Sequence, residues 1–230
     1  MDRVRHITRT GQFQADVAAV DTLSPRMRRI TLCTPAIAER DWPLASDIAI
    51  VLTGEDGREV RRRYTVRGTD GACLVVDAVL HGHGPGSAWA SSVGVADEVT
   101  FFGPRGEVPL TTASSVLALT DESGLPAIAA VAEARQGPIT VLAEVADDGE
   151  HYPLPSNADV TWLPRGDRPA GAVPGFLQAL DALAPDAQYA YVLGESRAIV
   201  TLRDELARFG LSRTEVYAKG YWNLNSRPAR

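Results

Sequence analysis

The sequence predicts two domains, a small antiparallel β-barrel followed by a parallel α/β domain. Up to about residue 110, short apolar segments are separated by turn residues, as in barrels built from short strands. From residue 115 onward, apolar segments alternate with helical patterns, which is typical of a parallel sheet buried on both faces. We therefore place the domains at residues 1–110 and 111–230, with the boundary near 109–113.

Turn residues delimit the strands expected in the first half. Gly54-Glu55-Asp56-Gly57 predicts a hairpin turn, and Gly68-Thr69-Asp70-Gly71 predicts a second turn. The strands cover residues 48–52, 63–67, 74–80 and 99–102, and the only helix expected here covers residues 85–93.

The second half reads as strands separated by helices. We expect strands at residues 116–120, 139–145, 160–163, 189–193 and 214–218, with helices at 125–135, 175–183 and 196–209. Ser196 is the expected N-cap of the last helix, and Gly210 is expected to end it. This order predicts a parallel sheet of the nucleotide-binding type.

Composition narrows the class of partner. The net charge is −6 and the isoelectric point is near 5.3, which argues against a nucleic acid or an anionic membrane. Positive charge is nevertheless concentrated within ten residues, at Arg58, Arg61, Arg62, Arg63 and Arg67. A basic site in an acidic protein suggests an anionic small ligand.

Cys33 and Cys73 are the only cysteines, and they lie forty residues apart without a Cys-x-x-Cys pair. This pattern is neither a disulfide framework nor an iron–sulfur or zinc signature. We find no signal peptide, and no apolar run approaches the roughly 18–20 residues of a membrane span. We expect a cytoplasmic protein, and nothing requires more than a monomer.

The segment around residues 61–67, followed by a glycine-rich loop, carries the most specific chemical signal. Arg62 offers a planar fork of donors for phosphate, Tyr64 a ring for stacking and Thr65 a hydroxyl. The amides of residues 84–87 lie at an expected helix start, where they can bind phosphate oxygens. Together these groups suit FAD, which has a planar ring at one end and a pyrophosphate in its middle.

Strand geometry limits this interpretation. Alternation places two sets of side chains on opposite faces, which are Arg62, Tyr64 and Val66 on one and Arg61, Arg63, Thr65 and Arg67 on the other. Tyr64 and Thr65 therefore reach one flavin only if the strand twists or ends nearby. The alternative is a solvated arginine cluster on an edge strand.

Other motifs leave alternatives open. His81 and His83 form an incomplete metal site, because no further ligand lies at a recognisable spacing. The glycines at 84 and 86 can bind phosphate or serve only as a turn, and Trp89 can fill the core or contact adenine.

In the second half, Asp121-Glu122-Ser123-Gly124 follows a strand, where a parallel sheet receives its ligand. No Gly-x-Gly-x-x-Gly is present, and two acids favour ribose or the nicotinamide amide over pyrophosphate. Arg165 or Arg168 could meet the 2′-phosphate of NADP, or could be loop charges. At the junction that contains Glu195, a helix cap and a role in nicotinamide positioning both fit.

Over nearly its whole length, the chain resembles the siderophore-interacting proteins, FAD-dependent ferric-siderophore reductases of the ferredoxin-reductase-like superfamily. The matching motifs occur in the expected order and are Arg62-x-Tyr64-Thr65-x-Arg67, Asp77 through His81-Gly82-x-x-Gly-Pro-Gly-Ser-x-Trp89-Ala90, Gly103-Pro104-Arg105-Gly106, Asp121 to Ile128, Gly194-Glu195 and Lys219-Gly220-Tyr221-Trp222. The chain departs from the family pattern at Ser123-Gly124, where Thr-Ala is usual, and at the tail from Asn223, with Arg227 and Arg230 displaced.

The resemblance implies a six-stranded FAD-binding barrel and an NAD(P)H-binding α/β domain. It implies cofactor contacts from Arg62, Tyr64, Thr65 (near flavin N5), Val66, Arg67, Asp77, His81, Gly84, Gly86, Ser87, Ser123, Arg165, Glu195 and Trp222, and no protein metal site. Lys219, Arg105 and Arg61 are candidates for binding an anionic ferric siderophore.

The implied function is ferric-siderophore reduction, with NADPH or NADH as electron donor or a ferredoxin in their place. One alternative is a flavin reductase that supplies a partner oxygenase. A second is a non-catalytic siderophore- or flavin-binding module, although the second domain argues against binding alone.

Overall fold

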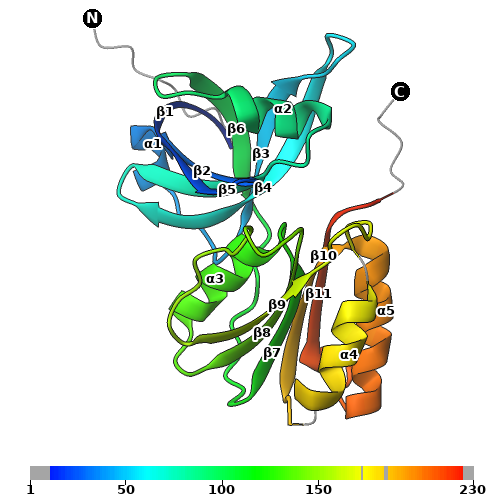
Figure 1. Cartoon of the computed structure of the whole chain (residues 1–230). Helices are drawn as coiled ribbons and strands as arrows, with labels where there is room; N and C mark the ends of the chain where they lie inside the picture. Colours follow the sequence, from blue (N-terminus) through cyan, green and yellow to red (C-terminus); the bar gives the residue numbers. More distant parts are fainter. Residues whose placement is uncertain (1–10, 172, 184–185, 225–230) are drawn as a thin grey trace, which may run out of the picture. The chain divides into compact units, whose positions relative to one another are not determined.

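The computed structural model describes residues 11–171, 173–183 and 186–224 and divides the chain into two compact units, residues 1–108 and 109–230 (Figure 1). Each unit has its own hydrophobic core. The predicted fold class is confirmed, because a closed antiparallel barrel precedes a separate parallel sheet with helices.

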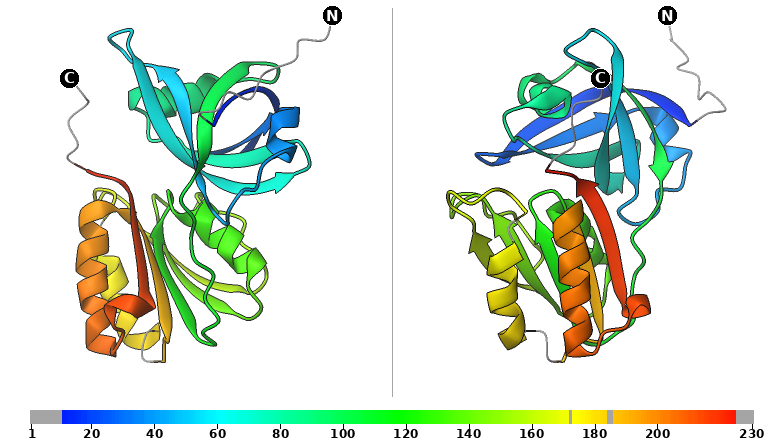
Figure 2. Two further views of the ribbon diagram at one scale, coloured as in Figure 1. Left: turned by 180° about the vertical axis from the view of Figure 1, so that it is seen from behind. Right: turned by 90° about the vertical axis from the view of Figure 1, so that its right-hand side faces the viewer.

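Six strands close the barrel of the first unit in the order β1-β2-β5-β4-β3-β6, and every pair is antiparallel (Figures 1 and 2). The strands are β1 (Gln12–Ser24), β2 (Met27–Cys33), β3 (Asp47–Thr53), β4 (Glu59–Asp70), β5 (Cys73–Val79) and β6 (Glu98–Arg105). Inside, the rings of Phe13 and Phe101 stack at 5.0 Å, and Trp42 packs against both. The barrel therefore has a filled apolar interior.

Several details of the barrel differ from the sequence prediction, which gave bounds for neither β1 nor β2. A short helix, α1 (Pro35–Ala38), was not expected, and it buries Ile37 completely. The turn expected over residues 68–71 begins later, because β4 continues to Asp70 and the chain turns at Gly71. A register shift between Val66 and Gly68 bends β4 instead, which is a usual effect of a β-bulge.

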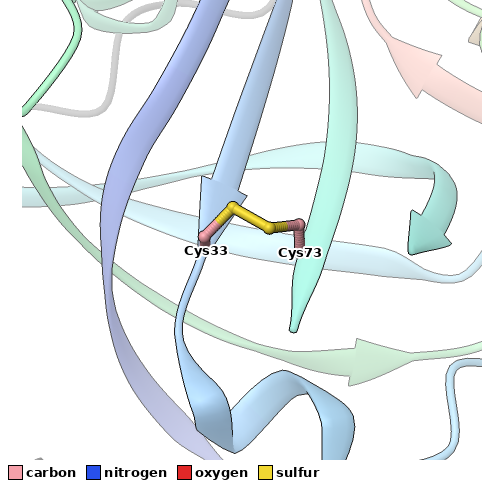
Figure 3. The surroundings of a disulfide bond; sticks show 2 residues. All are labelled: Cys33 and Cys73. Atoms are coloured by element: carbon pink, nitrogen blue, oxygen red, sulfur yellow. A yellow bond between two sulfur atoms is a disulfide. The ribbon is translucent and has the colours of Figure 1, made fainter. Parts of the chain in front are cut away.

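The cysteine prediction was wrong, because Cys33 and Cys73 form a disulfide between β2 and β5 (Figure 3). The two strands are antiparallel neighbours, and their register places these residues directly opposite each other. The spacing of the two cysteines in the sequence does not indicate this pairing, because the pairing depends on which strands become neighbours in the closed barrel.

The second unit contains a five-stranded parallel sheet in the order β11-β10-β7-β8-β9. Its strands are β7 (Val116–Asp121), β8 (Ile139–Val145), β9 (Ala158–Pro164), β10 (Tyr189–Glu195) and β11 (Val216–Trp222). Helix α3 (Leu125–Ala134) covers one face, and α4 (Val173–Leu183) and α5 (Ser196–Leu206) cover the other (Figures 1 and 2). The carboxyl ends of all five strands thus share one edge, where parallel sheets bind ligands.

The start of α5 also corrects a prediction, because Glu195 rather than Ser196 is its N-cap. The Glu195 carboxylate accepts hydrogen bonds from the amides of Arg197 (2.7 Å) and Ala198 (2.8 Å), satisfying donors that a helix start leaves open. At the other end, 3₁₀ turns occupy Ala207–Phe209 and Arg213–Glu215, and Gly210 follows the first with φ of +88°. Within the described residues, no helix is both long and apolar enough to cross a membrane.

Candidate functional site

The first turn of α2 (Gly84–Ser92) lies against β4 in the barrel. The Tyr64 hydroxyl donates a hydrogen bond to the Gly86 carbonyl (3.1 Å), and the rings of Tyr64 and Trp89 lie 5.3 Å apart. Burial raises the pKa of Tyr64, although the neighbouring Arg62 acts to lower it, so the phenol stays protonated and keeps its donor. This contact brings the two segments singled out in the sequence together.

Gly86 makes this close approach possible. A Cβ atom at Gly86 would lie 3.0 Å from the Tyr64 hydroxyl oxygen and 3.3 Å from Cγ of Arg62. Before the helix, Gly82 and Gly84 adopt φ of +80° and +76°, which favours glycine, and the Gly82 amide donates to Ser87 Oγ (3.1 Å). Glycines therefore allow the loop to turn into α2 and allow the Tyr64 and Arg62 side chains to approach its first turn closely.

Arg28 holds the other end of α2 and was missed by the sequence analysis. Its Nη1 donates to the carbonyls of Ala90 (2.6 Å) and Ser91 (2.9 Å), where a helix leaves acceptors open and favours a cation. Only the pairing of β2 with β5 brings Arg28 near the helix, so no local sequence signal marked it. Both ends of α2 are thus fixed to the barrel.

A groove of about 600 Å³ runs between the β3–β4 hairpin and α2. Its lining residues are Leu52, Thr53, Gly54 and Glu55 from the hairpin, and Gly82, His83, Gly84, Pro85, Ser87, Ala88, Trp89, Ser91 and Ser92 from the loop and helix. Trp89 also packs against the barrel core, which is the first of the two roles considered for it.

The residues present fit FAD. No side-chain hydrogen bond caps the start of α2, so the first-turn amides can face a phosphate. The half-buried Arg62 packs beside Gly86, where its Cγ lies 3.3 Å from the position that a Cβ would take, so its guanidinium is attached close to these amides. The groove volume is typical of a nucleotide-sized ligand site.

Arg61 and Arg62 are neighbours on β4, but their side chains have different surroundings. Arg62 is half-buried beside Tyr64 and donates to the Arg61 carbonyl (3.1 Å). Arg61 is exposed, pairs with Glu59 (3.0 Å) and lies 4.1 Å over the Phe102 ring. Arg62 is therefore the arginine that the strand presents to α2.

At the bend of β4, Thr65 and Val66 are buried, and Arg67 is half-buried. The Thr65 hydroxyl donates to the buried Asp47 carboxylate (3.3 Å). A register shift follows Val66, and a β-bulge of this kind increases the local twist of a strand.

Asp77 forms an ion pair with Arg29, and His81 packs against a second histidine. Both carboxylate oxygens of Asp77 accept from Arg29 at 2.8 Å, which is a buried bidentate pair across β2 and β5. The His81 ring lies edge-on to His83 at 4.5 Å. His81 is exposed, but partial desolvation lowers its pKa, and the charges of His83 and Arg62 lower it further against an opposing backbone hydrogen bond, so the imidazole is neutral near pH 7. In the described part of the chain, no three His, Cys, Asp or Glu side chains form a metal site.

In the second unit, Asp121 lies at the carboxyl end of β7 and joins three strands. Its buried carboxylate accepts from the amide and hydroxyl of Ser123, the Glu195 amide (2.9 Å) and the Trp222 indole (2.8 Å). Burial raises the pKa of Asp121, although these hydrogen bonds oppose the effect. Gly194 has φ of +144°, and a Cβ there would lie 2.5 Å from Asp121 Oδ2. Asp121 stands in a motif noted in the sequence, but no local pattern indicates that it joins the ends of three strands.

Arg165 is already paired, which bears on the expected NADP contact. Its Nη1 lies 2.5 Å from Glu122 and 3.8 Å from Glu144, and its side chain is 12% exposed. Glu144 also accepts from the Gly171 amide (2.7 Å), and burial raises its pKa to about 7. Arg168 is exposed and donates to the carbonyls of Pro164 and Arg165, so it is the more accessible of the two arginines.

Sequence profiles match both units of the chain. The profile described as "Siderophore-interacting FAD-binding domain" matches residues 41–108, and the profile described as "Siderophore-interacting protein" matches residues 113–225. The chain belongs to the siderophore-interacting protein family. Among curated proteins, no sequence matched significantly.

Solved structures of the family resemble this member over nearly its full length. A siderophore utilization protein from T. fusca is 28% identical, with a TM-score of 0.83 and 95% of each chain covered. The siderophore-interacting protein SipS from Aeromonas hydrophila is 25% identical, with a TM-score of 0.80 and coverage of 95% of this chain and 94% of that one. A ferredoxin reductase of carbazole 1,9a-dioxygenase shares the fold at 16% identity, with a TM-score of 0.72 and coverage of 92% and 69%.

Three basic residues of this family member were expected to bind substrate. Arg105 is exposed at the end of β6. Lys219 on β11 places its Nζ 4.9 Å from the centre of the Tyr221 ring. With the exposed Arg61, each offers positive charge at a surface of its own unit.

Proposed function

We propose that this chain is an FAD-dependent reductase of ferric siderophores, with NADPH or NADH as electron donor. The hydrogen bond of Tyr64 to Gly86 supports this proposal most directly, because it sets Arg62 beside uncapped amides at the start of α2. In a family described by its FAD-binding domain, this combination fits the pyrophosphate of FAD.

In this proposal, residues 1–110 bind FAD. Arg62 and the amides of Gly86 and Ser87 hold the pyrophosphate, and Gly84 lets the loop turn toward it. Tyr64 and Thr65 orient the flavin ring, with Thr65 near N5, and Val66 and Arg67 follow along the bent strand. His81 stays neutral in the flavin pocket, and Asp77 holds Arg29 and so supports the strand that leads into the loop.

Residues 111–230 bind the electron donor in this proposal. Ser123 and Glu195 lie at the carboxyl edge of the sheet, where they are held by Asp121. Trp222 is fixed to the same carboxylate and presents its ring beside that edge. Arg165 acts indirectly through its pairs with Glu122 and Glu144, whereas Arg168 is the available cation for a 2′-phosphate.

When bound, FAD supplies the chemistry that couples two-electron oxidation of the hydride donor to single-electron reduction of chelated Fe(III). The chain contributes binding and orientation. Hard oxygen chelators hold Fe(II) less tightly than Fe(III), so reduction releases the iron. Ferric siderophores are often anionic, and Lys219, Arg105 and Arg61 supply positive charge in a chain whose net charge is −6.

The test begins with the visible spectrum of the purified chain before and after adding FAD and desalting. We expect a retained two-band flavin spectrum that NADPH or NADH bleaches without oxygen. Adding a ferric siderophore should then restore the colour and yield Fe(II), trapped by a ferrous chelator. A chain that fails to retain FAD contradicts the proposal. Retained flavin that reduces ferric chelates no faster than free flavin does would favour the flavin-reductase alternative.

A further inference from the structure

The disulfide of the first unit joins the end of β2 to the start of β5 (Figure 3). Leu32 and Leu74, the neighbours of the two cysteines along β2 and β5, are fully buried in the core, whereas Cys33 and Cys73 are half-exposed. Because side chains alternate along a strand, the sulfur atoms lie outside the apolar core. The disulfide therefore lies on the solvent side of these two strands, which is where a thiol reagent would approach it.

The pairing of β2 with β5 also holds the two cysteines opposite each other. Cys33 and Cys73 face each other in the β2–β5 ladder with a Cα–Cα distance of 4.1 Å, close to that of a non-hydrogen-bonded antiparallel pair. The ladder continues past them, because the Thr34 amide donates to the Ala72 carbonyl (2.9 Å). Just beyond, Ile37 of α1 is fully buried. After reduction, the two thiols would stay opposite each other and could re-form the bond.

Acidic residues flank the disulfide on both neighbouring strands. Asp16 on β1 is the register partner of Cys33, and Asp70 on β4 is the register partner of Cys73. Both aspartates are exposed, and register partners share one face of a sheet. The row Asp16–Cys33–Cys73–Asp70 therefore puts a carboxylate on each side of the sulfur pair.

We propose that Cys33–Cys73 is a reversible thiol–disulfide site that reacts with dithiols in the folded protein, and that Asp16 and Asp70 disfavour anionic thiols. The thiolate of a dithiol attacks one sulfur, forms a mixed disulfide and releases the other cysteine as a thiolate, which takes up a proton. The second thiol of the reagent then attacks the mixed disulfide and releases the second cysteine. Two electrons pass to the protein, and the dithiol leaves as a disulfide. This site is independent of flavin chemistry.

Reversibility is tested on the full chain under native conditions. Dithiothreitol followed by iodoacetamide should add two carbamidomethyl groups, as measured by mass spectrometry, while far-ultraviolet circular dichroism remains unchanged. Oxidised dithiothreitol added before alkylation should restore the bond and abolish the mass increase. The proposal is overturned if the purified chain already carries two free thiols that oxidised dithiothreitol does not join. It is equally overturned if reduction requires guanidinium.

Charge selectivity is tested with two monothiols, cationic cysteamine and anionic glutathione. The ratio of their initial rates should fall several-fold in D16N/D70N and also in 1 M potassium chloride, because both changes weaken the field of the carboxylates. The matched control D159N/D181N removes the same charge from exposed positions in the second unit and should leave the ratio unchanged. Equal ratios in the wild type and in D16N/D70N would overturn the role of the two aspartates.

Discussion

The indole N–H of Trp222 donates to Oδ2 of Asp121 at 2.8 Å, although 101 residues separate the two along the chain. The Glu195 amide donates to the same oxygen at 2.9 Å. Asp121 ends β7, Glu195 ends β10 and Trp222 ends β11, so one buried carboxylate joins three neighbouring strands. The aromatic residue that sequence analysis assigned to cofactor binding is therefore also part of the sheet's own structure.

Replacing Trp222 with Phe should destabilise the second unit. The ring is kept but the donor is lost, and removing a hydrogen bond to a buried charged group costs about 1–3 kcal/mol. Urea unfolding followed by circular dichroism measures this loss. Trp162→Phe is the control, because Trp162 stacks on His151 at 4.6 Å and Phe preserves stacking. If W222F unfolds like the wild type and only the KM of the donor changes, Trp222 has no structural role.

Arg62→Ala should weaken FAD binding, whereas Arg61→Ala should not. Arg62 is half-buried beside α2, but Arg61 is exposed and paired with Glu59. A charge-assisted hydrogen bond contributes about 1.5–3 kcal/mol, so the dissociation constant should rise roughly 10- to 100-fold in R62A. Flavin fluorescence during titration of the cofactor-free protein measures the constant. Equal affinities of R61A and R62A would place the pyrophosphate elsewhere.

Local patterns in the sequence predicted much of the fold but few of its long-range contacts. Turn residues and apolar segments located the barrel and the parallel sheet, because hairpins and buried strands depend on neighbouring residues. Alternation along β4 also separated Arg61 from Arg62, and in the structure one is exposed and the other half-buried. These features depend on backbone geometry within a few residues.

The remaining features depend on residues brought together by strand order. Cys33 and Cys73 pair because β2 and β5 are neighbours, and Arg28 reaches α2 for the same reason. Ser196 has the usual chemistry of an N-cap, but its hydroxyl donates to the Trp222 carbonyl (2.9 Å) while Glu195 caps the helix. A preference for serine at helix starts could not reveal a competing acceptor on β11.

Glu144 should make the stability of the second unit depend on pH. Its pKa rises from 4.5 to about 7, chiefly because of burial, while the Gly171 amide and Arg165 oppose the shift. Between these two values the folded state binds more protons than the unfolded state. The free energy of unfolding should therefore fall as pH rises from 4.5 to 7, by about 2–3 kcal/mol for this group, and then level off.

Glu144→Gln should remove that part of the pH dependence, because the amide does not titrate. The raised pKa values of Asp121 and Glu122 act in the same direction, and the lowered pKa of Glu195 acts in the opposite direction, so the comparison with the wild type isolates Glu144. Urea unfolding at pH 5, 6, 7 and 8 supplies the measurement. The exposed Asp148→Asn is a control that should follow the wild type. Parallel pH profiles of E144Q and the wild type would show that Glu144 titrates normally.

Gly86→Ala should lower FAD affinity without unfolding the barrel. The added Cβ would lie 3.0 Å from the Tyr64 hydroxyl oxygen and 3.3 Å from Cγ of Arg62, so both side chains must shift from the start of α2. A displacement that costs one hydrogen bond corresponds to about 1 kcal/mol, or a roughly fivefold rise in the dissociation constant. Gly94→Ala is the matched control just beyond the same helix, because its Cβ would meet only Asp97 Oδ2, at 4.0 Å. Thermal unfolding of the cofactor-free variants separates a packing defect from a binding defect. A G86A variant that binds FAD like G94A would show that FAD binding does not depend on the close approach of Tyr64 to α2. It would also exclude the start of α2 as the pyrophosphate site.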